Sequence, residues 1–438
     1  MKLFIDVTRI STRVVGSTPT GIDRVEFAYA TEIMENHRDL NPVSVITTPF
    51  FSGALRGSVT RDILKRVSAA WKLDLPPSQD KIYQSLKDYL ESPIDVHRQR
   101  SHRVRGAAPL PRAVRQGFFP VRSLARASAR LRRRVNVRAH RPSCYLNSSQ
   151  TQLEKIERFG WTESAAIPCV FFIHDVIPID YPEFVSPHSC ERHEGRMETV
   201  GRLASAVIVN SEYTAQSVEA YLVSHGFPVP QIKVIPLGVT EWFTRKRRLE
   251  PPQAATPYFV AVSTIEPRKN FLFLFSVWRK LTEIFGVNTP RLVIVGNRGW
   301  ENENVLDVLD RSRSLAPFLV EATDLSDSGL ASLLRGATAL LSPSTVEGYG
   351  LPVAEALSLG VPVIASDIAA HREVGRKHAT YLDVIDGQGW TGVLRDFVTP
   401  DTNRRETALN LTRNYRATTL RDHVSDAVAF TQSAIGAA

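Results

Sequence analysis

The most informative segment of the chain reads Ser342-Pro-Ser-Thr-Val-Glu-Gly-Tyr-Gly-Leu-Pro-Val-Ala-Glu355. It follows an apolar run, Ala337 to Leu341, that is typical of a buried strand. It leads into a predicted helix, Pro352 to Leu359, with proline at the favoured first position. Gly348 and Gly350 lie in the turn between them. A strand, a glycine-bearing turn and a helix N-terminus together aim backbone N–H groups and a positive helix end at an anion, typically a phosphate.

Two acidic side chains border this turn, Glu347 in the loop and Glu355 in the first turn of the helix. The segment resembles the E-x7-E signature of the retaining glycosyltransferases of family 4, which have the GT-B fold. The agreement continues through Ala356, Gly360-Val-Pro-Val-Ile-Ala-Ser-Asp367 and Arg372-Glu-Val-Gly375. Two acids at this spacing are common, and an ordinary strand–helix unit with an unoccupied turn is the alternative. The whole 34-residue run, in order, favours the functional interpretation.

The resemblance implies an α/β protein of GT-B architecture, in which two Rossmann-like domains face a central cleft. It implies that Glu355 accepts hydrogen bonds from the ribose of a nucleotide and that Glu347 contacts the donor sugar. A carboxylate accepts two hydroxyl donors well, so both roles are chemically reasonable. Glu347 would also stabilise positive charge on the sugar in an oxocarbenium-like transition state. The donor is further expected to contact the turn residues Gly348, Tyr349, Gly350 and Leu351.

A basic motif, Thr264-Ile-Glu-Pro-Arg-Lys-Asn270, follows an apolar strand and opens a helix. It resembles the family's glycine-arginine and lysine element, whose basic side chains hold the donor diphosphate. Lys269 matches the lysine, Thr264 stands near the place of the arginine, and Arg268 is the candidate to replace that arginine. A diphosphate leaving group needs cationic neutralisation. The chain has no Asp-x-Asp metal-binding motif, so we expect these side chains and helix N-termini to act without a metal or cofactor. The alternative for Lys269 is a solvated lysine at a helix start.

Further candidates lie at the ends of other predicted strands. His174 ends the apolar run from Ala166 and resembles the family histidine that faces the sugar, although a lone histidine is usually structural. Ligands bind at the carboxyl ends of strands in open α/β sheets, which favours a role for it. Gly21 would let the backbone approach the diphosphate. Arg24 fits a diphosphate or acceptor contact and a surface salt bridge equally well, and Arg298 follows a later strand near the expected base or diphosphate.

The composition is that of a two-domain globular protein. The chain has 438 residues, too many for one core, with 43% hydrophobic and 23% charged residues. No apolar run reaches the length of a membrane span, and the acid in Met1 to Asp6 argues for a strand rather than a signal peptide. Cys144, Cys169 and Cys190 lack metal-ligand spacing and fit a reducing cytosol. We therefore expect a cytoplasmic protein.

Strands alternating with helices predict two parallel sheets flanked by helices. The first series gives an N-terminal, acceptor-side domain over residues 1–240. The segment 241–256 contains Pro251-Pro252 and no periodicity, and is predicted to be the interdomain linker. A second series gives the nucleotide-sugar-binding domain over 257–415. The resemblance implies that a last helix, 416–438, crosses back to the N-terminal domain.

An arginine-rich insertion is expected at about 96–142, where fourteen arginines occur without an acid or a lysine. Subtracting them from the formal net charge of +9 leaves −5, so the basic character belongs to this segment. Its second part suits a helix on an anionic membrane surface, or one that binds an anionic acceptor. The apolar residues expected to enter the headgroup region are Phe118, Phe119, Val121, Leu124 and Leu131. A flexible, solvated insertion is the alternative, and nothing indicates nucleic-acid binding.

The function expected from the resemblance is transfer of a sugar, with retention and without a metal, from a nucleotide diphosphate donor to a hydroxyl acceptor. The motifs Thr264 to Asn270 and Gly296-Asn-Arg-Gly-Trp300 look most like those of mannosyltransferases of bacterial surface polysaccharides, including lipopolysaccharide. A GDP-sugar donor and a glycan or lipid-linked acceptor are therefore expected, with peripheral association at the inner face of the membrane. A non-catalytic scaffold, a nucleotide-sugar epimerase and a phosphorylase are the alternatives.

Overall fold

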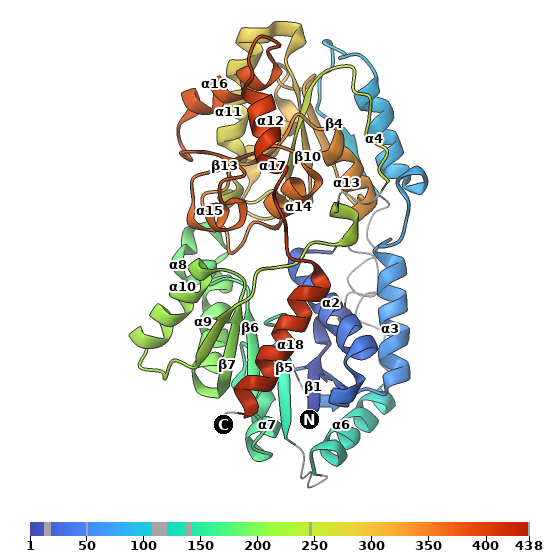
Figure 1. The fold of residues 1–438 in the computed structure, drawn as a ribbon, viewed down its shortest axis with the longest axis vertical. Coiled ribbons are helices and arrows are strands. Elements are labelled where there is room, and N and C mark those ends of the chain that lie inside the picture. Colours follow the sequence, from blue (N-terminus) through green and yellow to red (C-terminus); the bar gives the residue numbers. More distant parts are fainter. Residues whose placement is uncertain (13–18, 50, 107–120, 137–141, 245–247, 437–438) are drawn as a thin grey trace.

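The chain folds into two parallel sheets, one above the other in Figure 1. The computed structural model describes residues 1–438 apart from 13–18, 50, 107–120, 137–141, 245–247 and 437–438, and it leaves out the side chains of 121–125 and 136. The described 3-10 turns are η1 Arg38–Leu40, η2 Pro77–Gln79, η3 Ile156–Phe159, η4 Pro182–Phe184, η5 Glu241–Phe243, η6 Pro267–Lys269 and η7 Gly286–Asn288.

The first sheet has the strand order β3-β2-β1-β5-β6-β7-β8 and is parallel except for β3, which forms a hairpin with β2. Its strands are β1 Lys2–Asp6, β2 Val43–Thr47, β3 Ser52–Ala54, β5 Ser143–Asn147, β6 Cys169–Ile173, β7 Ala204–Val209 and β8 Gln231–Val234. The helices of this half are α1 Thr8–Thr12, α2 Gly21–Asn36, α3 Gly57–Ala70, α6 Val121–Asn136, α7 Gly160–Ser164, α8 Ile177–Asp180, α9 Pro187–Leu203, α10 Glu212–Ser224 and α18 Leu420–Gly436.

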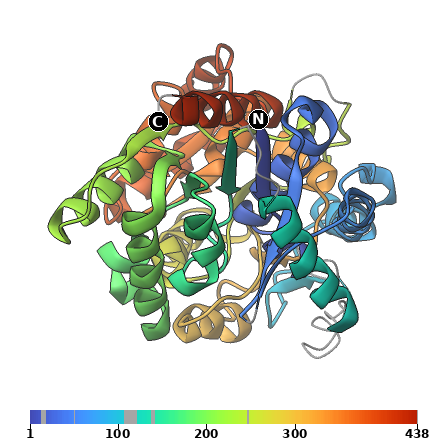
Figure 2. The same cartoon turned by 90° about the horizontal axis from the view of Figure 1, so that it is seen from below.

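Both faces of the first sheet are covered, which explains why its central strands are apolar throughout. Alternate residues of β1 point to opposite faces: Leu3 and Ile5 join the core under α2 and α18, whereas Phe4 joins the core with α9 and α10. Helix α18 packs against α2 and β7, so the end of the chain returns to the first domain. Figure 2 shows α18 along one side of this domain and α6 on another.

The second sheet is wholly parallel and has the order β14-β13-β12-β9-β10-β11-β4. Its strands are β4 His102–Val104, β9 Tyr258–Val262, β10 Arg291–Val295, β11 Leu319–Ala322, β12 Ala339–Ser342, β13 Val363–Ser366 and β14 Thr380–Leu382. Its helices are α4 Lys81–Glu91, α11 Phe271–Phe285, α12 Glu303–Arg311, α13 Asp327–Gly336, α14 Leu351–Leu359, α15 Ala369–Gly375, α16 Gly387–Val398 and α17 Arg404–Thr412.

The expected boundary of the first domain, residues 1–240, is wrong for one segment, because α4 and β4 belong to the second sheet. Strand β4 pairs with β11, and α4 packs against α13. The buried carboxylate of Asp80 joins the two parts: Oδ1 accepts from Ile82 N at the start of α4, and Oδ2 accepts from Ser326 N before α13. These contacts are far apart in sequence, so local patterns cannot reveal them.

The arginine-rich segment does not form one insertion. Its beginning contains β4, and its later part contains α6, which packs against β3. Ala127 and Leu131 are 1% and 3% exposed, and a Cβ on Gly53 would lie 2.8 Å from the Ala127 Cβ. Leu131 therefore cannot enter a headgroup region, because it already packs in the protein core. Of the other residues expected there, Phe118 and Phe119 lie outside the described residues, as do the side chains of 121–125.

Candidate active site

The loops after β9 and β12 lie at the point where the order of the second sheet reverses. From β9 the chain continues to β10 on one side and later to β12 on the other. Open α/β sheets bind ligands in the crevice at such a point, outside the carboxyl ends of the strands. The loop after β9 carries Arg268 and Lys269, and the loop after β12 carries Glu347. The topology thus brings together three residues predicted from separate motifs.

Arg268 and Lys269 both bind the carboxylate of Glu347. The Lys269 ammonium donates to Oε1, and the Arg268 Nη1 donates to Oε2 at 2.6 Å. Two residues that the sequence analysis did not single out complete the cluster. Glu266 accepts Arg268 Nε at 2.7 Å, and Ser344 Oγ donates to Glu347 Oε1 at 2.7 Å. The Ser-x-x-Glu spacing was a signal for Ser344, whereas Glu266 carried none beyond its position inside the basic motif.

The cluster keeps Glu347 ionised. Burial acts to raise the pKa of Glu347, but Lys269 and Arg268 outweigh it and hold the pKa well below its usual value. Lys269 is only 9% exposed, and burial together with Arg268 lowers its pKa. A carboxylate held between two cations is a poor proton donor and a weak nucleophile, but it can stabilise a positive charge placed beside it.

The N-terminus of α14 presents an uncapped helix end to the same region. Gly350 precedes the helix with a φ of +100°, a backbone conformation that favours glycine, and no side chain caps the helix. A Cβ on Gly350 would also lie 3.1 Å from the ring of His371. Leu351 is the first residue of the helix. Pro352 has no N–H, and Val353 N donates to the Gly350 carbonyl at 3.0 Å. The positive end of the helix dipole and the Leu351 N–H therefore remain to favour an anion here.

Glu355 is buried on the second turn of α14, because the helix begins at Leu351, and it faces Arg24 of the first domain. It is 3% exposed, its Oε1 lies 3.7 Å from Arg24 Nη1, and within the described part of the chain no donor is hydrogen-bonded to it. Burial raises its pKa to about 8, against the attraction of Arg24. Arg24 Nη2 also lies 2.6 Å from Asp327. Arg24 is therefore not a surface salt bridge, because it joins the two domains.

Gly348 marks the closest approach of the two domains at the site. Its carbonyl accepts hydrogen bonds from Ser211 Oγ at 2.7 Å and from Thr214 Oγ1 at 3.3 Å, both at the start of α10. A Cβ at this position would lie 2.5 Å from the His174 carbonyl oxygen and 2.9 Å from the Asp175 Cβ. The sequence analysis places Gly348 at an anion; the structure adds that the contact between domains requires a glycine here.

Tyr349 continues this interface, because its hydroxyl donates to the Leu237 carbonyl at 3.1 Å.

Arg298, a candidate for the donor site, forms ion pairs with two other side chains. It binds the carboxylates of Asp310 and Glu321, which raise its pKa. The candidate role of Arg298 at the base or diphosphate is therefore not supported. Two carboxylates already neutralise it.

His174 is held in one tautomer. Its Nε2 lies 2.8 Å from the Ser148 carbonyl, so that nitrogen carries the proton and Nδ1 is an acceptor. Burial lowers the pKa of His174 to about 4, and the side chain is 4% exposed. The His174 carbonyl accepts from Asn210 Nδ2 at 2.9 Å. A neutral, fixed imidazole at this strand end can accept a hydrogen bond from a ligand hydroxyl, but it is not a proton donor near neutral pH.

Gly21 opens α2 on the first-domain side. Thr20 caps the helix reciprocally with Asp23, and Arg9 Nε binds Asp23 at 2.5 Å. Among the described residues, a Cβ on Gly21 would meet no atom within 4 Å, so space beside it is open in that part of the structure. The structure thus leaves room for a ligand beside this backbone, but no close packing requires the glycine.

A buried pair of acids, which the sequence analysis did not single out, supports the first-domain loops. Asp6 accepts from Thr8 N at 2.9 Å and from the Tyr145 hydroxyl at 2.8 Å. Glu26 accepts from Ile10 N at 2.6 Å and from Ser149 Oγ at 3.0 Å. Burial raises the pKa of Asp6 to about 6 and that of Glu26 to about 8. The acid at the end of the first strand was the only sequence signal for this pair.

Two further observations concern metal binding and membrane-spanning helices. In the described residues, no three His, Cys, Asp or Glu side chains are grouped so that they could hold a metal ion. The described helices also include none with the length and hydrophobicity needed to cross a membrane.

Known proteins resemble this chain in sequence and in fold. Residues 243–388 match the family described as glycosyl transferases group 1. The serotype-specific mannosyltransferase WbdA of Escherichia coli is 28% identical over 245 residues, which cover 53% of this chain and 29% of WbdA. The O-antigen chain mannosyltransferase RfbU of Salmonella typhimurium is 27% identical over 226 residues, covering 51% of this chain and 59% of RfbU. The chain thus spans less than two thirds of the length of either relative.

HepE of Anabaena, solved in complex with UDP, superposes with a TM-score of 0.61 at 15% identity, covering 99% of this chain and all of HepE. The architecture is GT-B, and the α/β fold expected from the sequence is confirmed. The stretch that matches the group 1 glycosyl transferase family, residues 243–388, carries the cluster around Glu347 and the carboxylate of Glu355.

Proposed function

We propose that the protein is a retaining glycosyltransferase that moves a sugar from a nucleotide diphosphate to a hydroxyl acceptor. The observation that carries the proposal is the convergence of Lys269, Arg268 and Glu347 beside the uncapped start of α14. This arrangement offers fixed positive charge where a diphosphate would depart and a fixed carboxylate beside it. Preorganised charges of this kind stabilise a transition state without reorganisation.

The reaction breaks the bond between the anomeric carbon and the diphosphate, and the electron pair leaves with the phosphate oxygen. The acceptor oxygen forms the new bond on the same face of the sugar and passes its proton to the departing phosphate. Lys269, Arg268 and the α14 N-terminus stabilise the charge that develops on the diphosphate. Glu347 stabilises the positive charge on the sugar, and His174 Nδ1 accepts a hydrogen bond from a sugar hydroxyl.

Glu355 is proposed to bind the ribose of the donor nucleotide. It is a buried carboxylate with unfilled acceptor capacity, and two neighbouring hydroxyls can satisfy it. We further propose that the sugar is mannose or a related hexose, carried as a GDP-sugar, and that the acceptor is a glycan or lipid-linked glycan of a surface polysaccharide. The names of WbdA and RfbU support this choice of sugar and process.

A screen of nucleotide sugars with product analysis by mass spectrometry tests the proposal. GDP-mannose should be consumed, and an acceptor mixture should gain a hexose. Glu347→Gln should abolish turnover, whereas the control Glu283→Gln, a change in an exposed ion pair on α11, should leave it intact. Consumption of UDP-sugars alone would overturn the GDP assignment. No hydrolysis or transfer with any donor, despite nucleotide binding, would favour a non-catalytic scaffold, and interconversion of free nucleotide sugars would favour an epimerase.

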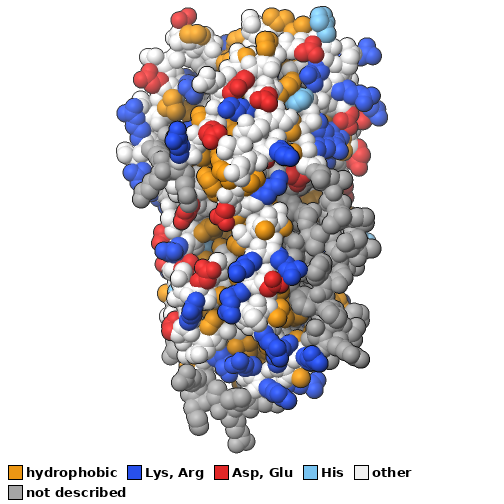
Figure 3. Space-filling model, turned by 90° about the vertical axis from the view of Figure 1, so that its right-hand side faces the viewer, with side chains coloured by type: hydrophobic (Ala, Val, Ile, Leu, Met, Phe, Trp, Pro, Cys, Tyr) orange, Lys and Arg blue, Asp and Glu red, His pale blue; other side chains and the backbone are white. Residues whose placement is uncertain are grey.

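We also propose that the protein works at the cytoplasmic face of an anionic membrane, which it binds peripherally through α6. Arg126, Arg132, Arg133 and Arg134 are exposed, and in the described part of the chain no carboxylate forms an ion pair with them. Figure 3 shows Lys and Arg side chains gathered at the lower end of the face on the right of Figure 1. The fraction of protein that sediments with anionic vesicles should therefore fall as the salt concentration rises. Equal binding to zwitterionic vesicles would contradict it.

A further inference from the structure

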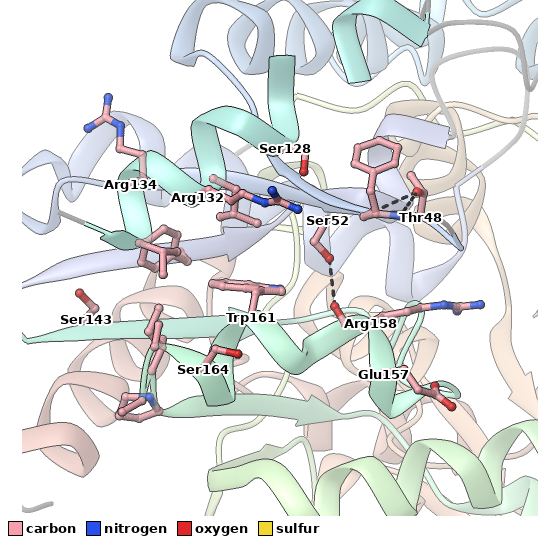
Figure 4. Close-up of a pocket in the computed structure, with 18 of the residues that line it drawn as sticks. Thr48, Ser52, Ser128, Arg132, Arg134, Ser143, Glu157, Arg158, Trp161 and Ser164 are labelled. Carbon is pink, nitrogen blue, oxygen red and sulfur yellow. Dashed lines mark hydrogen bonds between the residues drawn. The ribbon is translucent and has the colours of Figure 1, made fainter. Parts of the chain in front are cut away.

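A cavity of about 1330 Å³ opens between α6 and the η3–α7 segment (Figure 4). It extends along the first sheet from the starts of β5 and β6 to Thr48 and Ser52, which follow the end of β2. Ligand pockets for small molecules usually measure roughly 300–1,000 Å³, so this cavity is large enough for an extended ligand. None of the residues assigned to the proposed transfer reaction is among the described residues that line it.

The rim of the cavity is cationic. Arg132 and Arg134 come from α6, Lys155 and Arg158 come from the opposite wall, and Glu157 is the acid among the described lining residues. Arg158 is already engaged, because it donates to Gln152 and to Glu154. Arg132, Arg134 and Lys155 have no carboxylate within ion-pair distance among the described residues. Burial and the nearby charge of Arg134 lower the pKa of Lys2, which is a sign that the local positive charge is not balanced.

The floor of the cavity is apolar and contains one unsatisfied donor. Trp161 packs edge-on against Phe4 and Tyr145, with ring centroids 5.6 and 5.4 Å away. Leu131 and Val135 of α6 line the facing wall. The buried Nε1 of Trp161 has no hydrogen-bond partner in the described residues. A buried N–H group without a partner is costly, so it calls for an acceptor supplied from outside. Figure 4 shows Trp161 and Arg132 on opposite sides of the cavity.

We propose that this groove binds one anionic phospholipid, with its headgroup at the rim that carries Arg132, Arg134 and Lys155 and the upper acyl chain over Phe4 and Trp161. A free phosphate would leave the apolar floor exposed, and an uncharged chain would leave the rim unneutralised. Only an anionic amphiphile complements both parts. The inference deepens the membrane association proposed above and rests on it: α6 attracts the surface, and the groove holds a single lipid.

The groove is tested with vesicles of phosphatidylcholine with and without phosphatidylglycerol, the latter carrying acyl chains brominated near the ester. Brominated chains should quench the fluorescence of the wild-type protein, and Trp161→Phe should lose most of this quenching while still sedimenting. The matched control is Arg126→Ala/Arg133→Ala, on the same helix but outside the groove. It should bind about thirtyfold more weakly, the general electrostatic loss given roughly 1 kcal/mol for each arginine near the surface. The double variant Arg132→Ala/Arg134→Ala should lose clearly more than this, because it also removes the contacts to the bound lipid.

Equal losses of vesicle affinity in the two double variants would overturn the proposal that the groove binds a lipid. Unchanged quenching in Trp161→Phe would do the same, and a general electrostatic attraction would remain. Ser164→Phe should weaken quenching at constant charge, because Ser164 is an exposed lining residue. Soluble short-chain phosphatidylglycerol should protect against quenching, whereas glycerol phosphate should not; equal protection would reduce the site to a phosphate site. Donor turnover, measured without vesicles, should be unchanged in all variants, so failure of the groove is distinguishable from failure of the proposed catalysis.

Discussion

The guanidinium of Arg24 lies 3.7 Å from the carboxylate of Glu355, across the cleft between the two domains. Arg24 belongs to α2 of the first domain, and Glu355 belongs to α14 of the second. The same guanidinium lies 2.6 Å from Asp327, at the start of α13. Arg24 is therefore placed to favour the ionised form of the carboxylate that we assign to the donor ribose.

Removing the charge in Arg24→Met should weaken nucleoside diphosphate binding at neutral pH. Without Arg24 the buried Glu355 keeps its proton to higher pH, and a protonated carboxyl accepts fewer hydrogen bonds. Calorimetry at neutral and alkaline pH should show affinity that partly recovers as pH rises. Arg421→Met is the control, because Arg421 is exposed and pairs only loosely with Glu32 at 3.8 Å. Equal nucleotide affinities for wild type and Arg24→Met at every pH would contradict an effect of Arg24 on the protonation of Glu355.

The raised pKa of Glu355 predicts a pH dependence of donor binding. Burial raises this pKa to about 8 in the free protein. If the nucleotide selects the ionised form, binding releases a proton, so affinity should increase with pH and level off above about 8. Glu355→Gln should bind roughly 1.5–3 kcal/mol more weakly and without this dependence. Calorimetry in buffers of different ionisation enthalpy counts the protons; a flat wild-type profile would contradict the assignment.

The sequence predicts the second domain well because its elements are local. Apolar runs such as Arg291 to Gly296 become strands, and the glycine turn before Glu355 becomes the start of α14. Strand β5, Ser143–Asn147, escapes prediction because it is short and follows the arginine-rich segment. The placement of α4 and β4 depends on contacts such as that of Asp80 with Ser326 N, which residues near in sequence do not encode.

The site was predictable in its residues but not in its pairings. The motifs identify Glu347, Lys269 and Arg268 separately, because each follows a strand. Only the reversal of strand order between β9 and β12 explains why they meet. Gly348 was expected to face an anion, yet its contact with His174 comes from the other domain. Relationships between domains leave no periodic pattern in a sequence.

Loss of the ammonium in Lys269→Met should lower turnover by about a hundredfold or more, because charge develops on the leaving diphosphate in the transition state. Glu347 keeps Arg268 as a partner, so the variant should fold. Lys280→Met provides a control, since Lys280 pairs with Glu283 on an exposed helix face. Single-turnover kinetics with saturating donor separates chemistry from binding. Full activity in Lys269→Met would mean that another cation neutralises the diphosphate.

A methyl group at position 348 should separate the domains. In Gly348→Ala the new Cβ would lie 2.5 Å from the His174 carbonyl oxygen, and backbone atoms cannot move aside cheaply. We expect turnover to fall sharply while the second domain still binds nucleotide, with a larger radius of gyration in solution scattering. The control is Gly392→Ala, in α16, where a Cβ would meet nothing within 4 Å. Unchanged scattering and turnover in Gly348→Ala would show that neither the domain arrangement nor the activity depends on the close contact of Gly348 with His174.

Truncation of Leu131 tests whether α6 is part of the folded core. Leu131 is 3% exposed and packs with the core that contains Phe4 and Tyr145. Leu131→Ala should lower the free energy of unfolding by about 2–5 kcal/mol, as expected for a buried leucine. Val223→Ala, at a site that is 62% exposed, should change it by less than about 0.5 kcal/mol. Denaturant unfolding gives both values. If Leu131→Ala left stability unchanged but weakened vesicle binding, the apolar face of α6 would have to leave the protein and enter the membrane, contrary to its packing against β3.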